Sequence, residues 1–349
     1  MKDKQVIFWL RSGIVMIMIM ITIGGITRLT GSGLSITEWK VVGGTIPPIT
    51  DAEWQVAFEK YQKTPEFILE NSDMKIEGFK TIFFWEYIHR LWGRIMGFVF
   101  LLPYLYFLKK GYFKANGLTR KMFLVLILGG LQGALGWFMV ASGLVDQPDV
   151  SHYRLTAHLL MALLLISYLF WLIYEVKMVA GTTEKKTHHP LNFLLKNTLG
   201  IIVLQLVYGG FMSGKKAAYS YPTYPDMAGK MIPDDLWHEG GLSNLSENVT
   251  TIHFIHRLLP WIITVLLIYI VVKLRKIPAD FLRLKGNVIL IFCLLALQIT
   301  LGIKTVLLDE GRISAFWGTS HQVVGVSFFL AIWWLYLSLT RVPEGKLAE

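Results

Sequence analysis

Two short segments of the sequence contain the same set of chemically active side chains. "EYIHRLWGR" at residues 86–94 and "HFIHRLLPW" at 253–261 each place a His-Arg pair at the start of a long apolar run. Glu86 in the first segment is replaced by His253 in the second. Ionisable side chains in such a setting are costly, so they are candidates for a functional site. The two pairs are His89 with Arg90 and His256 with Arg257.

The chain that must position these residues is strongly apolar. Of its 349 residues, 54% are hydrophobic and 17% are charged, a balance typical of an integral membrane protein. Several nearly uncharged segments are long enough to cross a hydrocarbon core about 30 Å thick. They lie at 7–28, 86–108, 121–144, 152–175, 194–213, 251–272, 286–304 and 315–340. We therefore predict an all-α integral membrane protein with eight transmembrane helices.

The distribution of positive charge predicts the orientation of these helices. The segments at 1–11, 109–121, 177–196, 273–285 and 341–349 are dense in Lys and Arg. By the positive-inside rule they face the cytoplasm, together with both termini. The net charge of +10 is explained by this bias and by contact with the lipid bilayer, so it does not indicate nucleic-acid binding. We expect a retained first helix in a bacterial inner membrane.

The sequence also indicates a duplicated four-helix unit. "LQGALG" at 131–136 matches "LQITLG" at 297–302, and other polar residues recur at nearly the same interval. We predict two parallel four-helix-bundle repeats, residues 1–176 and 177–349, related by an axis normal to the membrane. The matched pairs are Gln132 and Gln298, 166 residues apart, His89 and His256, 167 apart, and His158 and His321, 163 apart.

The repeat places four histidines at similar depth, within the first turns of the even-numbered helices and toward the outer leaflet. A single intramembrane histidine is more often a core residue or part of a proton path than a ligand. Two histidines from the second and fourth helices of each half favour instead a haem held between facing imidazoles of a bundle. Such ligation leaves no open position on the iron, which favours electron transfer or chemistry at the ring edge.

A polar stripe on the helix at 86–108 has two open interpretations. Its residues are spaced three and four apart and therefore share one face. Its arginines either extend into the lipid headgroups as interfacial ion pairs or bind haem propionates, as Arg257 would in the second half. The stripe includes Glu86, His89, Arg90 and Arg94.

Two further features concern packing. Glycines at 129, 130, 133 and 136 form a small-residue face, for which close helix packing is expected. The outer loops at 29–85 and 214–250 are rich in aromatic residues and contain no low-complexity tract, so we expect folded caps. The one cysteine, Cys293, excludes an internal disulfide and a cysteine-based metal site.

Six separated motifs are distributed over nearly the whole chain. They are "GGITRLTGSGLSITEWKVVGGTIPP" at 24–48, "EYIHRLWGR" at 86–94, "LQGALGWFMVASGL" at 131–144, "YRLTAHL" at 153–159, "ENVTTIHFIHR" at 247–257 and "SHQ" at 320–322. Together these motifs resemble the haem A synthase family, in the branch shared by proteobacteria and mitochondria.

The resemblance implies oxidation of the methyl group at position 8 of haem O to the formyl group of haem A, by successive hydroxylations, for cytochrome oxidase assembly. It implies haem b bound by His256 and His321 in the second half. It further implies that haem O faces His89 and His158 in the first half, with Glu86 as the essential carboxylate. Candidate partners are haem O synthase, a membrane electron acceptor and a second copy of the chain.

The chemistry of the residues agrees with these roles. A carboxylate one helical turn from His89 lies near the expected ring edge, where it stabilises positive charge on the methyl carbon and accepts a proton from attacking water. His253 cannot supply a fixed negative charge. Two alternatives remain: a bis-histidine dihaem cytochrome b that oxidises quinol, and a duplicated transporter with histidines in a proton path.

Overall fold

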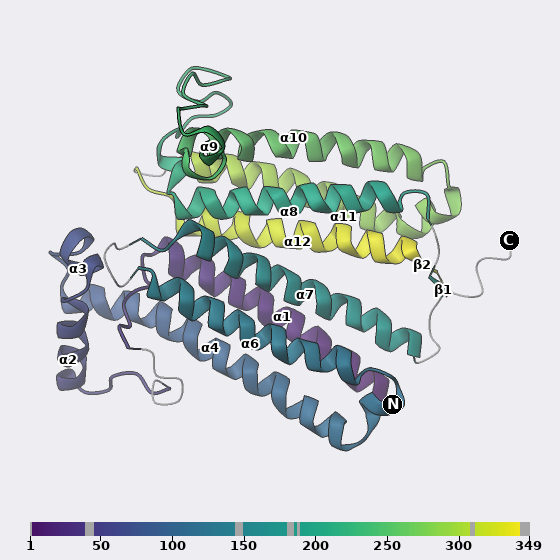
Figure 1. Ribbon diagram of the computed structural model, residues 1–349, viewed down its shortest axis with the longest axis horizontal. Coiled ribbons are helices and arrows are strands. Elements are labelled where there is room, and N and C mark those ends of the chain that lie inside the picture. The colour runs from purple at the N-terminus through teal and green to yellow at the C-terminus, as the bar shows by residue number, and fades with distance from the viewer. Residues whose placement is uncertain are drawn as a thin grey trace. The chain divides into compact units, whose positions relative to one another are not determined.

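The computed structural model describes residues 2–38, 45–143, 149–179, 185–186, 189–307 and 311–342. Within these ranges the protein is almost entirely helical (Figure 1). Eight helices are long and apolar enough to cross a membrane, which confirms the predicted fold class. They are α1 (Lys2–Leu29), α4 (Ile76–Lys109), α6 (Thr119–Ala141), α7 (His152–Val179), α8 (Asn192–Gly214), α10 (Val249–Leu274), α11 (Pro278–Val306) and α12 (Ala315–Thr340).

Shorter elements form the connections between these helices. The first outer loop contains α2 (Asp51–Tyr61) and α3 (Pro65–Glu70), and the second contains η1 (Ala217–Tyr219), η2 (Gly241–Ser243) and α9 (Asn244–Glu247). Both loops are therefore folded in their described parts, as predicted. The remaining elements are α5 (Tyr112–Ala115) and two strands, β1 (Lys185–Lys186) and β2 (Arg341–Val342), which pair antiparallel.

The helix α4 begins ten residues before the start predicted from hydropathy, at Ile76 instead of residue 86. This extension packs Phe79 against Phe58 and Tyr61 of α2, with ring centroids 5.2 and 5.1 Å apart. Consequently His89 lies thirteen residues into its helix, and the prediction that it lies within the first two turns was wrong. Aromatic packing on the outer loop accounts for the longer helix.

Many large apolar side chains on the long helices point away from the protein. Phe98, Leu102 and Val265 are 64%, 61% and 66% exposed. Apolar exposure on this scale marks a contact surface. On helices of membrane-spanning length that surface is suited to lipid, in agreement with the predicted partner.

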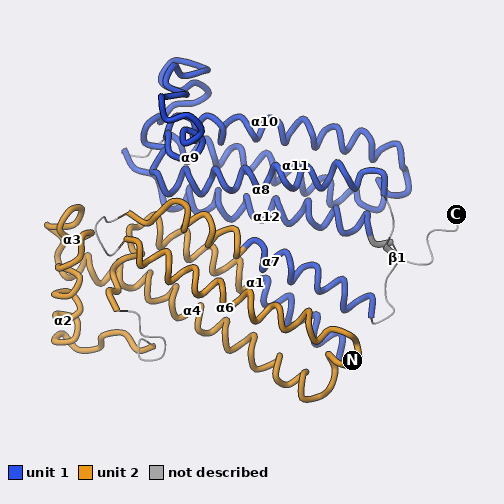
Figure 2. The backbone as a smooth tube through the Cα atoms, viewed as in Figure 1, with its two compact units in different colours: residues 1–14, 163–349 blue, residues 15–162 orange. Residues whose placement is uncertain are grey.

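One compact unit consists of residues 1–14 and 163–349 (Figure 2). Within it α8 contacts α10 and α12, while α11 contacts the same two helices. The four helices thus form a ring in which α10 and α12 are diagonal. Side chains on the inner faces of α10 and α12 can therefore meet across the bundle.

The second compact unit consists of residues 15–162. Here α4 is joined to α1 by the Trp92 indole, which donates to the main-chain oxygen of Met16 over 3.0 Å. The start of α7 is joined to α6 by Arg154, which donates to the oxygen of Phe138 over 2.9 Å. These contacts are compatible with the predicted repeat. The division into functional halves at residue 176 stays a prediction.

Candidate functional site

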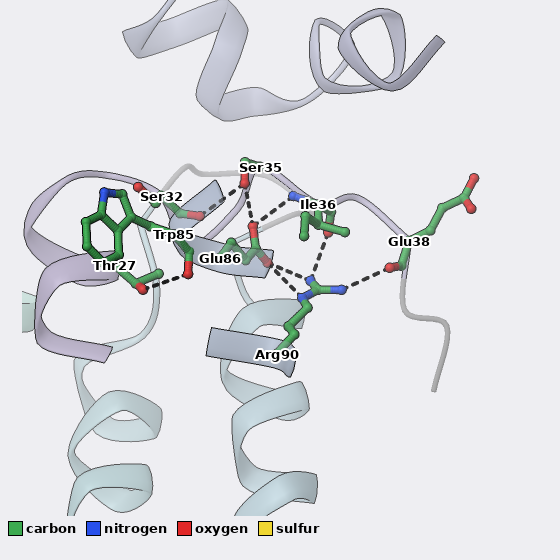
Figure 3. A network of polar contacts seen from close by, with 8 residues as sticks. All are labelled: Thr27, Ser32, Ser35, Ile36, Glu38, Trp85, Glu86 and Arg90. Atoms are coloured by element: carbon green, nitrogen blue, oxygen red, sulfur yellow. Dashed lines mark hydrogen bonds and ion pairs between the residues drawn. The ribbon is translucent and has the colours of Figure 1, made fainter. Parts of the chain in front are cut away.

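Glu86 is buried beneath the segment that follows α1 (Figure 3). Its Oε2 atom accepts hydrogen bonds from the Ser35 hydroxyl over 2.7 Å and from the Ile36 main-chain N–H over 2.8 Å. Its Oε1 atom accepts from the Arg90 guanidinium, from Nε over 3.1 Å and from Nη2 over 2.6 Å. Four donors therefore surround one carboxylate, an arrangement that stabilises its charged form.

Arg90 also binds the outer segment directly. Its Nη2 atom donates to the main-chain oxygen of Ile36 over 2.9 Å, and its Nη1 atom donates to that of Glu38 over 3.0 Å (Figure 3). Because Arg90 lies one turn after Glu86, one helix face presents a carboxylate and a guanidinium together. The hydrogen bonds of Glu86 and Arg90 therefore attach residues 35–38 to α4.

In the second half of the chain an arginine also attaches an outer loop to its helix, but its neighbour is a histidine instead of a carboxylate. Arg257 donates from Nε to Nε2 of His253 over 3.0 Å, so His253 takes the position that Glu86 has in the first half. The remaining Arg257 nitrogens donate to main-chain oxygens of the outer loop at 2.8 to 2.9 Å. The accepting residues are Tyr221, Thr223 and Asp226.

A carboxylate of this outer loop is held in place by hydroxyl groups. Asp235 accepts from Thr250 over 2.8 Å and from Tyr221 over 3.0 Å. The hydrogen bond from Thr250, followed by that from Tyr221, keeps the pKa of the Asp235 carboxyl below its ordinary value. The loop is thus joined to the start of α10 at a second point.

These bonds clarify the roles of the arginines. Arg90 and Arg257 both bind loop main chain, so they have a structural function whatever else they bind. The sequence did not anticipate it, although the equal spacing of Arg90 and Arg257 within the two motifs was a signal for a shared task. Binding of haem propionates by Arg90, Arg94 and Arg257 stays a prediction, and Arg94 is half-buried one turn beyond Arg90.

The imidazoles of His256 and His321 meet across the bundle formed by α8, α10, α11 and α12. Their ring centroids are 6.3 Å apart, with an angle of 76° between the ring planes. A histidine nitrogen lies about 2 Å from a bound metal and the ring centre roughly 1 Å behind it, so two axial imidazoles place their centres roughly 6 Å apart. The pair therefore fits the haem b that the sequence predicts.

Neighbouring polar groups orient His321. Its Nδ1 atom is 3.1 Å from the main-chain oxygen of Gln298, and its Nε2 atom is 3.4 Å from the side-chain nitrogen of the same residue. A carbonyl oxygen only accepts, so Nδ1 bears the proton and Nε2 keeps its lone pair. This is the tautomer that a metal-binding imidazole requires.

His256 is oriented by a residue that the sequence did not single out. The side-chain nitrogen of Gln205 on α8 lies 3.2 Å from Nδ1 of His256 and 3.0 Å from its main-chain oxygen. Such contacts fix the rotation of a ligating ring. No pattern in the sequence pointed to Gln205, because the repeat has Met20 at the matching position of α1.

The structure also brings together the two histidines of the first half. His89 and His158 are close enough to interact electrostatically. The side-chain nitrogen of Gln132 lies 3.4 Å from Nε2 of His158, the same distance that separates Gln298 from His321. The four predicted histidines thus lie as two pairs, one in each compact unit.

Ser35, which donates to Glu86, is a second residue that the sequence did not identify. We expect Ser35→Ala to raise amide hydrogen exchange at Ile36 about ten-fold or more, because a hydrogen bond to a charged group contributes about 1.5–3 kcal/mol. Ser32→Ala is the matched control, since the Ser32 hydroxyl bonds Thr30 in the same segment. Unchanged exchange at Ile36 would show that Ser35 does not hold the segment on Glu86.

Comparisons with known proteins agree with this arrangement. A family model described as cytochrome oxidase assembly protein matches residues 7–333. The haem A synthase of Nitrosospira multiformis is 40% identical over 344 residues, covering 97% of this chain and 94% of that protein. Haem A synthases of Flavobacterium psychrophilum and Paramagnetospirillum magneticum are 39% and 42% identical, over 92% and 73% of this chain and 94% and 73% of their own lengths.

The eight apolar helices and the family model define a multi-pass membrane protein of the cytochrome oxidase assembly class. Similarity to its relatives extends over nearly the whole chain. The chain therefore belongs to the haem A synthase family.

Proposed function

We propose that this chain is a haem A synthase, an oxidoreductase that converts the position 8 methyl group of haem O into the formyl group of haem A. The main support is the difference between the two halves. Each half has a pair of neighbouring histidines, but only the first places a buried carboxylate, Glu86, one turn before its histidine. A reaction that develops positive charge needs such a group, whereas a site for a resident cofactor does not.

The proposed reaction balances as two hydroxylations and a dehydration. In each hydroxylation, water forms one C–O bond to the substrate carbon, while two electrons and two protons leave. The products are the alcohol and then the hydrated aldehyde, which loses water to give the formyl group. The sum is one methyl group and one water converted to one formyl group, with release of four electrons and four protons to a membrane electron acceptor.

Glu86 acts in this scheme as a fixed negative charge beside the reacting carbon. Its oxygens already accept from Ser35, Ile36 and Arg90. Accepting a proton would require one of these donors to leave, whereas stabilising a nearby positive charge requires no rearrangement. The geometry thus favours charge stabilisation over the proton-acceptor role that the sequence also suggested.

His256 and His321 are the residues that would hold haem b. When bound there, haem b supplies a route for single electrons away from the substrate. The bundle contributes the rest: Gln205 and the main chain of Gln298 fix the two rings, and Arg257 holds the outer loop. His89 and His158 would bind haem O in the first half, so we assign residues 1–176 to the substrate and 177–349 to the cofactor.

The proposed setting is a bacterial inner membrane, with both termini in the cytoplasm and the haem sites toward the outer leaflet. The clustering of Lys and Arg in the loops opposite the folded outer caps supports this orientation. Haem O synthase is the proposed source of substrate, because haem O is apolar and reaches a buried site most directly from a neighbouring membrane protein. Self-association remains part of the proposal.

The test is chromatography of haems extracted from the purified protein, produced with and without a supply of haem O. We expect haem b under both conditions and haem A only when haem O is supplied. The absorption spectrum of the same samples reports whether each haem is bound at a six-coordinate site.

The alternatives predict different results in this experiment. A dihaem cytochrome b would contain two haems b under both conditions and would leave both rings unchanged. A transporter with histidines in a proton path would be colourless. Either result, obtained with folded protein, would contradict the proposed function.

A further inference from the structure

We propose that Gly136 and Gly302 are positioning residues that set the locations of the His158 and His321 imidazoles, and thereby the axial ligation of the haem in each half. The proposal rests on the proposed function only in assigning a haem to each histidine pair. It assigns a task to Gly136, which the sequence predicted to serve helix packing, and to Gly302, for which the sequence predicted no role.

Both glycines lie directly against an imidazole. A methyl group built at Gly302 would lie 2.9 Å from Cε1 of His321, and one built at Gly136 would lie 3.0 Å from Cε1 of His158. Carbon atoms that are not bonded prefer separations of about 3.5–4.0 Å, so an alanine at either position forces the ring or the helix to move. The absence of a side chain therefore creates the space that each imidazole occupies.

Other glycines on the same helices have no such contact. A methyl group built at Gly129, Gly130 or Gly133 of α6 would meet nothing within 4 Å among the described residues, and the same holds for Gly286 of α11. Among the glycines of the small-residue face on α6, only Gly136 makes a close contact in the described residues. The side chain that it contacts is His158. Proximity to an imidazole, not helix packing in general, distinguishes Gly136 and Gly302.

The contact recurs at matching positions of the two halves. Gly136 and Gly302 end the matching segments "LQGALG" and "LQITLG", four residues after Gln132 and Gln298. Each glutamine places its side-chain nitrogen 3.4 Å from Nε2 of the same histidine. In each half, Gln and Gly one helical turn apart therefore enclose one imidazole, with Gly against its carbon edge and Gln at the nitrogen that would bind iron.

The other two histidines have a looser version of the same arrangement. A methyl group at Gly24 would lie 3.3 Å from Nε2 of His89, and one at Gly209 would lie 3.4 Å from Cε1 of His256. A ring can adjust to these distances more easily. The effect of Gly→Ala should accordingly be largest at Gly302 and Gly136, and smaller at Gly24 and Gly209.

Displacement of His321 has a direct consequence for the iron. The His256 and His321 rings are spaced for one metal ion between them, and His321 is also held by the oxygen of Gln298. Shifting the ring by a few tenths of an ångström would move Nε2 away from the position in which it would hold the iron, or would break the hydrogen bond at Nδ1. Loss of such outer contacts typically lowers metal affinity 10- to 100-fold.

The test compares Gly302→Ala with one matched control, Gly286→Ala, in the full-length protein. Gly286→Ala adds a methyl group to the same helix in open space. The measurements are haem b per polypeptide, the rate of haem b loss to a haem scavenger, and the low-spin electron paramagnetic resonance spectrum.

We expect Gly302→Ala to lose haem b about ten-fold faster or more, with shifted low-spin signals, and Gly286→Ala to resemble the parent protein. Wild-type retention and spectrum in Gly302→Ala would overturn the proposal, whatever its activity. Equal haem loss from Gly286→Ala would also overturn it, because the cause would then be general helix packing. Thermal unfolding of each variant shows whether a loss of haem merely follows from misfolding.

The matching variant in the first half is Gly136→Ala, with Gly133→Ala as control. We expect Gly136→Ala to keep haem b and to raise the KM for haem O about ten-fold or more. An unchanged KM would contradict the proposal for this half. If the parent protein made no haem A but Gly302→Ala still lost haem b, the proposed function would fail while the role of Gly302 would stand.

Discussion

Glu86→Gln is expected to lower the rate of haem A formation by about 100- to 1,000-fold, the usual effect of removing a group that stabilises transition-state charge. The substitution keeps the shape of the side chain and removes its negative charge. It also leaves the Arg90 guanidinium beside a neutral group. An amide has only one acceptor oxygen, so it cannot accept from both Ser35 and Arg90 as the two carboxylate oxygens do. Chromatography of extracted haems should show haem O accumulating at the expense of haem A, with haem b unchanged.

Two controls separate charge from loop attachment in this experiment. Ser35→Ala removes one donor to Glu86 but keeps the carboxylate and the Arg90 pair. We expect Ser35→Ala to lose much less activity than Glu86→Gln, on the order of ten-fold at most. If Ser35→Ala were as inactive as Glu86→Gln, attachment of the outer segment would be the important property. Normal haem A in Glu86→Gln would show that the carboxylate has no catalytic role.

His256→Ala should remove haem b from the purified protein almost completely. His256 and His321 face each other at the spacing of two axial ligands, and a haem with one remaining imidazole loses half of its protein–iron bonds. Haem b per polypeptide, measured by absorbance after extraction, should fall at least ten-fold. His321→Ala should behave in the same way.

The paired experiment is His89→Ala, which tests which half of the chain binds the substrate and which binds the cofactor. We expect this variant to keep haem b and to accumulate unconverted haem O, because His89 lies in the unit formed by residues 15–162. If His89→Ala lost haem b and His256→Ala kept it, the assignment of substrate and cofactor would be reversed. If either variant lost both haems, the proposal that the two halves bind their haems independently would be contradicted.

Much of the fold was predictable because lipid imposes a simple requirement on the sequence. A helix that crosses a bilayer needs a long uncharged run, and each predicted run corresponds to a helix in the structure. The beginning of α4 was not predictable in this way. Its first turns include the charged residues Glu77 and Lys80, so hydropathy alone places the start of the helix too late in the sequence. Aromatic contacts with α2 stabilise these first turns.

The candidate site divides along similar lines. Glu86 and the four histidines stand out in the sequence because ionisable residues are rare in apolar segments. Ser35, Gln205 and the two glycines do not, because serine, glutamine and glycine are ordinary in loops and helices. Their importance arises from contacts across the fold: Ser35 meets Glu86 from 51 residues away, and Gln205 meets His256 from 51 residues away.

The sequence by itself determined the membrane-spanning architecture, the family and the ionisable residues of the site, since each depends on composition or on a short motif. The tertiary structure alone decided what surrounds those residues. It placed four hydrogen-bond donors around Glu86 and set the ring centroids of His256 and His321 6.3 Å apart. It also placed Gly136 and Gly302 against the imidazoles of His158 and His321. These features depend on distances between helices, and such distances arise only when the helices pack.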